Sequence, residues 1–486
     1  MPPSAGVTFP AFARRLILLI GTVIAACVST TQGDTWWALR AGRDIWHHRT
    51  ISLTDHYSYT AAGDPWPDHE WLWQALIYPL HVIGGLPLIT LVVGLMAGAM
   101  LAFSTAAGAV RRTDLVVLVL AVPGLIGSWS LRPQVLSMLG FALILWLLRE
   151  RRWWWWWCVP LLLVWANAHG GVVYGGLALG SACLAALLRR PYRGYLRTLL
   201  PVTVLGALAT LATPLGTGLW HYVLTSGSRP FENRITEWQP AYEHLTFYTG
   251  IFWAWVAGIV VLVAAVAILR RDRLRTWSAA LGLVSTLATL PLAIDATRNM
   301  TMFVVAATPL AVELLRPATP RPRANDTVPL ARPLLAGAGA IGALVTALIY
   351  FLAPAGLNWH PISPRIVQAV ESCPGRVYTT YDSGAYLIWF APGVKVFADN
   401  RQDPYSEQIL DLSILSASSP YVGVFDRYDI RCAAVLTWND STLSTLSRDG
   451  WTTAVRDGQW VVLTAPGVTL DRTPSSATTM PLASAS

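Results

Sequence analysis

The sequence predicts an α-helical polytopic membrane protein, with about 11 to 13 transmembrane helices, that carries a small C-terminal α/β domain. Of its 486 residues, 54% are hydrophobic and only 13% are charged, and the mean hydropathy is +0.47. A soluble protein carries about 25% charged residues. Several apolar stretches approach the length that crosses a bilayer, and the composition becomes more polar from about Pro354.

The positions of the arginines predict the orientation in the membrane. They fall in clusters at the ends of apolar stretches, as in cytoplasmic loops. The net charge of +8 therefore reflects orientation, and nucleic acid is excluded as a partner. The first apolar stretch lacks a clear cleavage site, so we expect a retained helix at about 16–32, a cytoplasmic N-terminus and a location in the plasma (inner) membrane. The clusters are Arg14–Arg15, Arg111–Arg112, Arg149–Arg152, Arg189–Arg197, Arg270–Arg275 and Arg316–Arg332.

Placing every arginine cluster in the cytoplasm orders the remaining membrane helices. Residues 71–110 are long enough to cross the membrane twice, with a break at His81–Pro87. Two crossings would, however, put Arg111–Arg112 outside. The number of helices between residues 70 and 115 therefore stays open. Residues 1–353 are thus predicted to form the membrane domain, with a first outer loop over 33–70. Among the later helices, one is expected to end at Arg149, one to run from Trp153–Trp157 to Trp165, and one to end at Ala212. The others are expected at 115–127, 171–188, 251–269, 277–292, 301–315 and 334–353.

Residues 354–470 are predicted to form an extracytoplasmic α/β domain, because short apolar stretches alternate there with turn residues. Cys373 and Cys432 could form a disulfide in that oxidising compartment. Residues 471–486, rich in Ser, Thr, Pro and Ala, are expected to be a disordered tail. The expected strands are Arg376–Tyr381, Val394–Asp399, Cys432–Trp438 and Gln459–Ala465, and the expected helices are Ser383–Phe390 and Ser406–Ala417.

Nearly every polar or aromatic island falls on the outer side in this arrangement. The largest is Gly33–Trp73, which holds acids, histidines, arginines and many Trp and Tyr residues. A solute transporter would be expected to show internal repeats or charged residues within its helices, and we see neither in the sequence. The pattern instead indicates a site at the outer membrane surface. The other islands are Ser128–Gln134, Trp165–Gly171, Ala212–Pro240 and Asp295–Asn299.

The first outer loop resembles that of the GT-C superfamily of membrane glycosyltransferases, which take a sugar from a polyprenyl-phosphate carrier on the extracytoplasmic side. In that superfamily an acid follows helix 1, then come a helix lying on the membrane, a segment with Gly and Pro, and a polar motif capping helix 2. The matching parts here are Gly33–Asp34, Thr35–Arg49, Gly63–Pro67 and Asp68–Trp73. The resemblance implies a GT-C-like fold in which this loop forms the floor of the active site.

Two further likenesses concern later islands. Residues 380–400 are similar to the signature of oligosaccharyltransferase catalytic subunits, which recognises a peptide acceptor. Tyr381, Asp382, Gly384, Tyr386, Asp399 and Asn400 match it, but Thr380 and Ser383 replace aromatic residues, which puts a peptide acceptor in doubt. Most of the chain is also similar to a set of bacterial polytopic membrane proteins that share the islands Trp165–Gly171, Thr213–Trp238 and Asp399–Tyr405.

Three acids are candidates for the catalytic carboxylate. Sugar transfer needs a carboxylate to accept or orient the proton of the acceptor, and Asp34 stands directly after helix 1. The alternative is that Asp34 caps the helix that follows it. Glu70 and Asp68 could supply a second carboxylate, and His69 between them could bind phosphate. The alternative for this group is a cap on the next helix, with Asp68 as the N-cap residue.

The remaining candidates fall into two groups. Four residues are predicted to bind the donor phosphate: Arg132, Arg298, His69 and His169. The alternative for the two arginines is that they extend to lipid headgroups. The alternative for His169 is a structural hydrogen-bond donor. The predicted acceptor contacts are Glu237, Trp238, Tyr381, Asp382, Asp399 and Arg401. Glu237 and Trp238 could instead anchor a loop. Asp399 and Arg401 could instead close a polar turn.

The resemblance, together with these residues, implies an inverting glycosyltransferase that moves a sugar from a polyprenyl-phosphate donor to an extracytoplasmic glycan, lipid or protein. The number of outward-facing acids would suit a divalent metal such as Mg²⁺ or Mn²⁺, although the sequence shows no ligand geometry. The leading alternative is a non-catalytic or transport protein on the same scaffold that handles lipid-linked sugars. It would keep the arginines but would not need Asp34.

Overall fold

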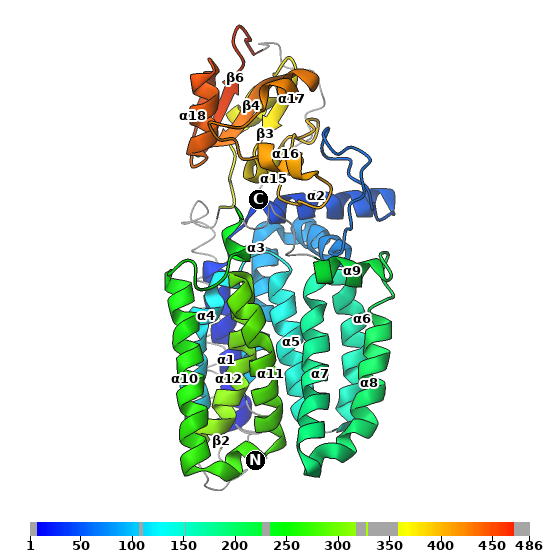
Figure 1. Cartoon of the computed structure of the whole chain (residues 1–486), viewed down its shortest axis with the longest axis vertical. Coiled ribbons are helices and arrows are strands. Elements are labelled where there is room, and N and C mark those ends of the chain that lie inside the picture. Colours follow the sequence, from blue (N-terminus) through cyan, green and yellow to red (C-terminus); the bar gives the residue numbers. More distant parts are fainter. Residues whose placement is uncertain are drawn as a thin grey trace, which may run out of the picture. The chain divides into compact units, whose positions relative to one another are not determined.

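The computed structural model describes residues 7–105, 110–150, 152–225, 234–316, 327–328 and 358–470 (Figure 1). The chain forms two compact units. The helical unit comprises Met1–Thr30 and Asp68–Leu357, and the α/β unit comprises Thr31–Pro67 and Asn358–Ser486. Most of the first loop, predicted to belong to the membrane domain, therefore packs with the C-terminal residues. Each unit is described by itself below.

The described part of the helical unit is a bundle of apolar helices. Four of them are long and apolar enough to cross a membrane, namely Trp71–Ser104, Gly170–Leu188, Phe247–Leu269 and Trp277–Asp295, and shorter apolar helices accompany them. This confirms a multi-pass α-helical membrane protein. The predicted helix at 334–353 lies outside the described residues. The helices are α1 (Phe9–Val28), α3 (Trp71–Ser104), α4 (Arg112–Leu125), α5 (Gln134–Arg149), α6 (Cys158–Ala168), α7 (Val173–Leu188), α8 (Leu196–Ala209), α9 (Gly218–Thr225), α10 (Phe247–Leu269), α11 (Trp277–Asp295) and α12 (Met300–Leu315).

Short elements join these helices. A two-residue strand, β1 (Val7–Thr8), pairs antiparallel with β2 (Thr327–Val328). The connections contain short 3₁₀ helices of three to six residues. They are η1 (Ile126–Ser128), η2 (Arg152–Trp157), η3 (Gly170–Val172), η4 (Arg190–Tyr195), η6 (Thr236–Trp238), η7 (Arg271–Arg275) and η8 (Thr297–Asn299).

Helix α3 is interrupted where the sequence predicted a break. Gly84 and Gly85 leave helical geometry, and Gly85 takes a φ of 62°, which glycine adopts at little cost. The segment after the break packs on α1 through Gly94 and Gly98, one helical turn apart. A Cβ at Gly98 would lie 2.3 Å from the carbonyl oxygen of Leu18, so these small residues allow the two backbones to approach closely.

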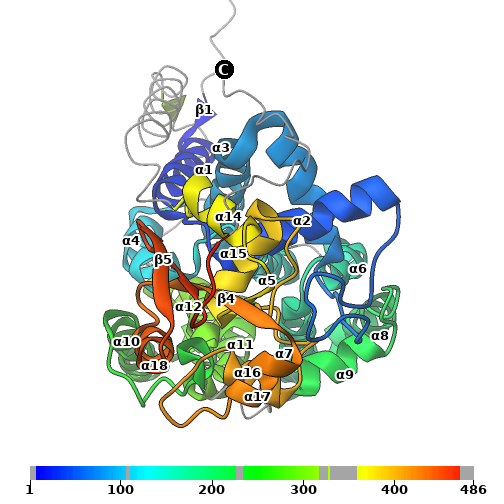
Figure 2. The ribbon, with the colours of Figure 1, turned by 90° about the horizontal axis from the view of Figure 1, so that it is seen from above.

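Helix α12 is the central helix of this unit. It packs against α4, α5, α10 and α11, as the view from above also shows (Figure 2). Almost its whole length is buried, including Met300, Phe303 and Leu310. A helix that is apolar on all sides requires this central position. It begins at Met300, two residues after Arg298, and therefore gives that predicted site residue a rigid support.

The α/β unit is built on a four-stranded sheet in the order β3-β4-β6-β5. Strands β3 and β4 are parallel, whereas β6 is antiparallel to both β4 and β5. The inner strands β4 and β6 are almost wholly buried, as their apolar sequences require. The elements are α2 (Gly33–His48), α14 (Pro364–Glu371), β3 (Arg376–Thr379), α15 (Tyr381–Phe390), α16 (Glu407–Leu412), α17 (Val422–Arg427), β4 (Ile430–Leu436), α18 (Asp440–Arg448), β5 (Thr452–Asp457) and β6 (Trp460–Thr464).

The structure corrects the predicted elements of this unit in two respects. Residues 394–399 are not a strand of the sheet, because Val396 pairs instead with the first loop, where it exchanges backbone hydrogen bonds with Tyr57 and Tyr59. Strand β5 and helices α14, α17 and α18 were not predicted. The burial pattern of β5, which is largely exposed, lacks the alternation that identifies a strand in sequence. The predicted tail, 471–486, lies outside the described residues.

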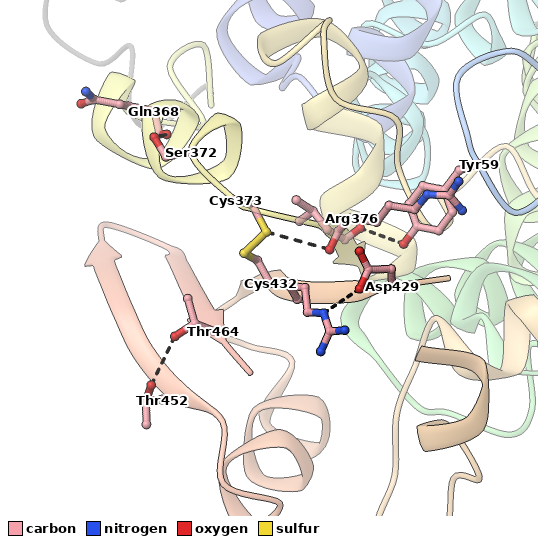
Figure 3. Close-up of a disulfide and its surroundings, with 11 residues drawn as sticks. Tyr59, Gln368, Ser372, Cys373, Arg376, Asp429, Cys432, Thr452 and Thr464 are labelled. Carbon is pink, nitrogen blue, oxygen red and sulfur yellow. Dashed lines mark hydrogen bonds and ion pairs between the residues drawn. A yellow bond between two sulfur atoms is a disulfide. The ribbon is translucent and has the colours of Figure 1, made fainter. Parts of the chain in front are cut away.

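The predicted disulfide between Cys373 and Cys432 is present, with a Cα–Cα distance of 6.1 Å (Figure 3). Cys432 lies in β4 opposite Val377 of β3, so the bond ties the segment entering β3 to the neighbouring strand. Of the other cysteines, Cys27, Cys158 and Cys183 are free.

Loss of this disulfide should lower the stability of the α/β unit. The bond closes a separation of 59 residues, for which the chain-entropy relation gives about 4 kcal/mol. We therefore expect Cys373→Ser to reduce the midpoint of thermal unfolding of this unit by several degrees, and reductant to have the same effect on the wild type. Cys183→Ser is the control for a free thiol. Equal midpoints for wild type and Cys373→Ser would contradict the expected contribution.

Candidate functional site

A carboxylate and two histidines meet at one end of the helical unit. Glu70 precedes the first residue of α3, and its Oε1 lies 3.5 Å from Nε2 of His69 and 3.5 Å from Nε2 of His169. His169 stands at the end of α6, in the predicted island Trp165–Gly171. All three side chains are largely buried. The structure thus brings together three residues predicted from two separate islands.

The charge state of this group is set by burial and by its neighbours. Burial alone would raise the pKa of Glu70, but the hydrogen bond with His69 and the charges of His69 and Arg132 hold it below the ordinary value. Burial lowers the pKa of His169 to about 3. At neutral pH, Glu70 is therefore a carboxylate and His169 is uncharged.

Asp68 is buried beside this group but faces its own helix start. Its Oδ1 accepts hydrogen bonds from the side chain of Gln74 at 2.6 Å and from the backbone N–H of Glu70 at 3.2 Å. This arrangement agrees with the helix-start alternative, although Glu70 rather than Asp68 is the N-cap residue. Burial raises the pKa of Asp68 to about 7. Asp68 is thus held in a setting that favours its neutral form.

The raised pKa of Asp68 should make stability fall as pH rises. The folded protein retains this proton up to about pH 7, whereas the unfolded chain releases it near pH 4. Stability is then lost progressively between pH 4 and 7, by up to roughly 4 kcal/mol for a shift of three units. Asp68→Asn keeps the Oδ1 acceptor and should remove this pH dependence in thermal unfolding at pH 5 and 8. The exposed Asp64→Asn is the control, and an unchanged pH slope in Asp68→Asn would contradict the assignment.

Two arginines from different islands approach one carboxylate. Nη1 of Arg132 lies 3.4 Å from Oε2 of Glu237, and Nη1 of Arg298 lies 3.9 Å from Oε1 of the same side chain. The guanidinium of Arg298 also stacks over the ring of Trp238, at 4.1 Å from its centroid. The arginines therefore share an acidic side chain.

Backbone contacts fix this cluster. The N–H of Thr297 donates to the carbonyl of Gln239 at 3.0 Å, and its hydroxyl donates to the carbonyl of Thr236 at 3.0 Å. These bonds hold η6, which carries Glu237, beside η8, which carries Arg298. Burial would raise the pKa of Glu237, but the charges of Arg132 and Arg298 hold it below its ordinary value.

The two groups form one cluster, which we call the arginine–carboxylate cluster. Arg132 contributes to the pKa of Glu70, of Glu237 and of His169, so its charge lies within range of all three. The cluster comprises His69, Glu70, Arg132, His169, Glu237, Trp238 and Arg298. Predicted residues from five islands therefore gather in the helical unit.

Asp34 belongs to the α/β unit, where it lies in the first turn of α2. It is not the N-cap residue, a position held by Gln32. The side-chain N–H of Asn400 donates a hydrogen bond to Oδ1 of Asp34. Gly33 makes room for this contact, because a Cβ there would lie 2.9 Å from Nδ2 of Asn400. The carboxylate is also favoured by the positive end of the α2 dipole. Whether Asp34 joins the arginine–carboxylate cluster stays a prediction.

The predicted acceptor residues Asp399 and Arg401 are buried in a network of charges. Arg401 lies 2.7 Å from Asp399 and 2.7 Å from Asp55, and the Tyr405 hydroxyl donates to Asp399. Asp55 comes from the first loop, so this network joins that loop to the C-terminal residues. Side chains so fully enclosed cannot contact an acceptor in this structure, which favours the alternative of a structural turn for both residues.

Tyr381 and Asp382 occupy the first turn of α15 and are partly exposed. The hydroxyl of Tyr381 accepts a hydrogen bond from Gln402 at 2.6 Å. Burial raises the pKa of Asp382, although hydrogen bonding to Trp438 and Asn439 opposes the shift. Thr380 and Ser383, which replace aromatic residues of the oligosaccharyltransferase signature, form the capping box of α15.

The sequence did not single out several residues that shape these sites. Asn400 holds Asp34, Asp55 pairs with Arg401, and Ser137 contacts His169 at 2.5 Å. Asn400 was noted only as part of a signature, and Ser137 lies within an apolar helix where no local pattern marks it. Across the described ranges, no group of three or more His, Cys, Asp or Glu side chains is placed to hold a metal ion.

Comparison with known proteins identifies the fold. The chain is similar to the archaeal oligosaccharyltransferase AglB from Archaeoglobus fulgidus, solved with an inhibitory peptide and a dolichol-phosphate, with 10% identity and a TM-score of 0.57 over 88% of this chain and 70% of that one. The apo form of the Archaeoglobus fulgidus oligosaccharyltransferase gives 12% identity and a TM-score of 0.52 over 87% and 69% of the two chains. ArnT from Cupriavidus metallidurans, bound to undecaprenyl phosphate, gives 15% identity and a TM-score of 0.49 over 93% and 97%.

The first two likenesses confirm the GT-C fold that the first loop implied. At these identities the likeness concerns the fold alone. No protein-family model matches the sequence, and a search of curated proteins finds no match.

Proposed function

We propose that this protein is a membrane glycosyltransferase that moves a sugar from a polyprenyl-phosphate donor to an extracytoplasmic acceptor. The observation that carries the proposal is the approach of Arg132 and Arg298, from two different islands, to the one carboxylate of Glu237. Two guanidinium groups that converge on one anionic group make a site suited to a phosphate, which arginine binds through planar, bidentate hydrogen bonds.

The fold supports a lipid phosphate as the ligand. The Archaeoglobus fulgidus oligosaccharyltransferase AglB, which shares this fold, was solved with a dolichol-phosphate. The arginines of the cluster stand at the ends of apolar helices, the depth at which a lipid phosphate lies in a membrane. A free anion would not require a site at that depth, so a phosphate attached to a polyprenyl chain fits the location better.

Carboxylates for the transfer step come from two segments. Glu70 is ionised within the cluster. Asp34 stands in the first turn of α2, where Asn400 donates a hydrogen bond to its Oδ1. We propose it as the base that accepts the proton of the acceptor.

Acceptor binding is assigned more narrowly than the sequence predicted. Tyr381 and Asp382 remain the proposed acceptor contacts, because both are partly exposed. Asp399 and Arg401 are left out, because both are buried. Glu237 and Trp238 are proposed to act on the arginines instead, since Glu237 neutralises them and Trp238 stacks under Arg298.

Removal of the Glu237 charge should tighten phosphate binding. A phosphate must replace this carboxylate or share the arginines with it, and like charges repel at such distances. We expect Glu237→Gln to bind a short-chain polyprenyl phosphate roughly five to ten times more tightly than the wild type, measured by titration of the detergent-solubilised protein. The exposed Glu243→Gln is the matched control from the same loop. Weaker binding by Glu237→Gln would mean that Glu237 contacts the ligand favourably.

The reaction itself is tested with defined donors. The full chain is reconstituted into liposomes that contain polyprenyl-phosphate hexoses or pentoses, and the release of polyprenyl phosphate is followed by mass spectrometry. Protein-dependent release from one donor class is the expected result. Tight binding of polyprenyl phosphate without turnover of any donor would instead support a non-catalytic or transport protein that handles lipid-linked sugars.

A further inference from the structure

We infer that a buried hydrogen-bond chain, Trp165–Ser137–His169, holds the imidazole of His169 as a donor to Glu70 and thereby orients that carboxylate. His169 is then a positioning residue, and its role differs from the phosphate binding that the sequence suggested. The relevance of this chain to sugar transfer rests on the proposed function, whereas the chain itself rests on the contacts described below.

The first step fixes which nitrogen of His169 carries a proton. The backbone N–H of Gly171 donates to Nδ1 of His169 at 3.3 Å. A backbone amide can only donate, so Nδ1 must present its lone pair. A neutral imidazole that accepts at Nδ1 carries its proton on Nε2. The low pKa that burial gives to His169 agrees with a neutral ring.

The second step is a side-chain contact that reinforces this tautomer. Oγ of Ser137 lies 2.5 Å from Nδ1 of His169 and accepts a hydrogen bond from Nε1 of Trp165 at 2.8 Å. The indole N–H is only a donor, so the Ser137 hydroxyl proton is available for Nδ1. All three side chains are buried, which removes competition from water.

The third step is the contact with the carboxylate. Nε2 of His169, which carries the proton, lies 3.5 Å from Oε1 of Glu70. Nε2 of His69 lies at the same distance from the same oxygen. Both histidines therefore approach Oε1. A carboxylate whose one oxygen is held by neighbouring side chains keeps its other oxygen in a fixed direction.

Two glycines leave room for this chain. A Cβ at Gly171 would lie 2.3 Å from Oγ of Ser137 and 2.8 Å from Nδ1 of His169. A Cβ at Gly140 would lie 2.8 Å from the ring of Trp165. Any side chain at either position would displace a member of the chain. This gives a physical reason for glycine at Gly171.

The test is ¹⁵N NMR of the histidine-labelled full chain in lipid nanodiscs, which needs no substrate. The protein has nine histidines, so the His169 signals are assigned by their loss in His169→Gln. We expect a neutral ring protonated at Nε2 throughout pH 5 to 8. Ser137→Ala should shift the Nδ1 signal and Glu70→Gln the Nε2 signal, whereas the exposed Asp272→Asn should shift neither.

A charged His169 at neutral pH, or a proton on Nδ1, would overturn the inference. So would an Nε2 signal that Glu70→Gln leaves unchanged. Where a donor is turned over, His169→Gln, whose amide can still donate to Glu70, should keep kcat within roughly tenfold of the wild type. His169→Ala should lower kcat more than it changes KM. If no donor is turned over while the NMR result holds, the proposed reaction fails and the orientation of Glu70 stands.

Discussion

Asp34→Asn is expected to abolish sugar transfer while leaving the fold almost unchanged. Asn keeps the Oδ1 atom that accepts the hydrogen bond from Asn400, so the contact that holds the side chain survives. Loss of the negative charge at the start of α2 costs about 0.3–1 kcal/mol. Removal of a general base lowers the rate by roughly 10²–10⁴-fold. The effect on transfer should therefore far exceed the effect on thermal stability.

The measurement compares donor turnover and thermal unfolding in the same preparations. Asp64→Asn, an exposed acid of the same loop, should match the wild type in both. Full transfer by Asp34→Asn together with loss of transfer in Glu70→Gln or Asp68→Asn would move the base to that group. Full transfer by all three variants would leave the enzymatic interpretation without a carboxylate and would favour the non-catalytic alternative.

Arg132→Gln is expected to weaken binding of polyprenyl phosphate by roughly 30-fold or more, about 2 kcal/mol. Arg132 stands out because its charge acts on Glu70, Glu237 and His169. Its loss would remove one arm of the proposed phosphate site and leave Arg298 to bind alone. Arg132→Lys keeps the charge but loses the planar fork, so its affinity should fall between those of the wild type and Arg132→Gln.

The control for Arg132 is Arg271→Gln, an exposed arginine of η7. If loss of any arginine reduced binding to the same extent, the effect would be general attraction to the lipid and not a specific site. Binding that is unaffected by Arg132→Gln would remove the donor-phosphate role from this residue. Thermal unfolding of each variant separates loss of affinity from loss of fold.

The gathering of distant islands in the helical unit could be predicted from the sequence. Glu70, Arg132, His169 and Arg298 each stand beside the end of an apolar helix, and the arginine rule assigned those ends to one side of the membrane. Helix ends on one side of a compact bundle lie near one another. A purely local pattern, the alternation of apolar stretches and arginine clusters, was therefore sufficient for this part of the candidate site.

The partners of individual side chains could not be predicted in the same way. Asp34 meets Asn400 across 366 positions of sequence, and no local pattern encodes such a pairing. Asp399 and Arg401 look like surface residues in the sequence because charged residues are rarely buried. Their burial depends on Asp55, from the first loop. Segment 394–399 alternates like a strand, yet its partner is that loop and not the sheet.

The most direct test of the proposed donor site is a cryo-EM structure of the full chain in lipid nanodiscs with a polyprenyl phosphate. We predict phosphate density within hydrogen-bonding distance of both Arg132 and Arg298, with the Glu237 carboxylate moved away from its place between them. Density for the phosphate at another site, with both arginines still paired to Glu237, would contradict the account.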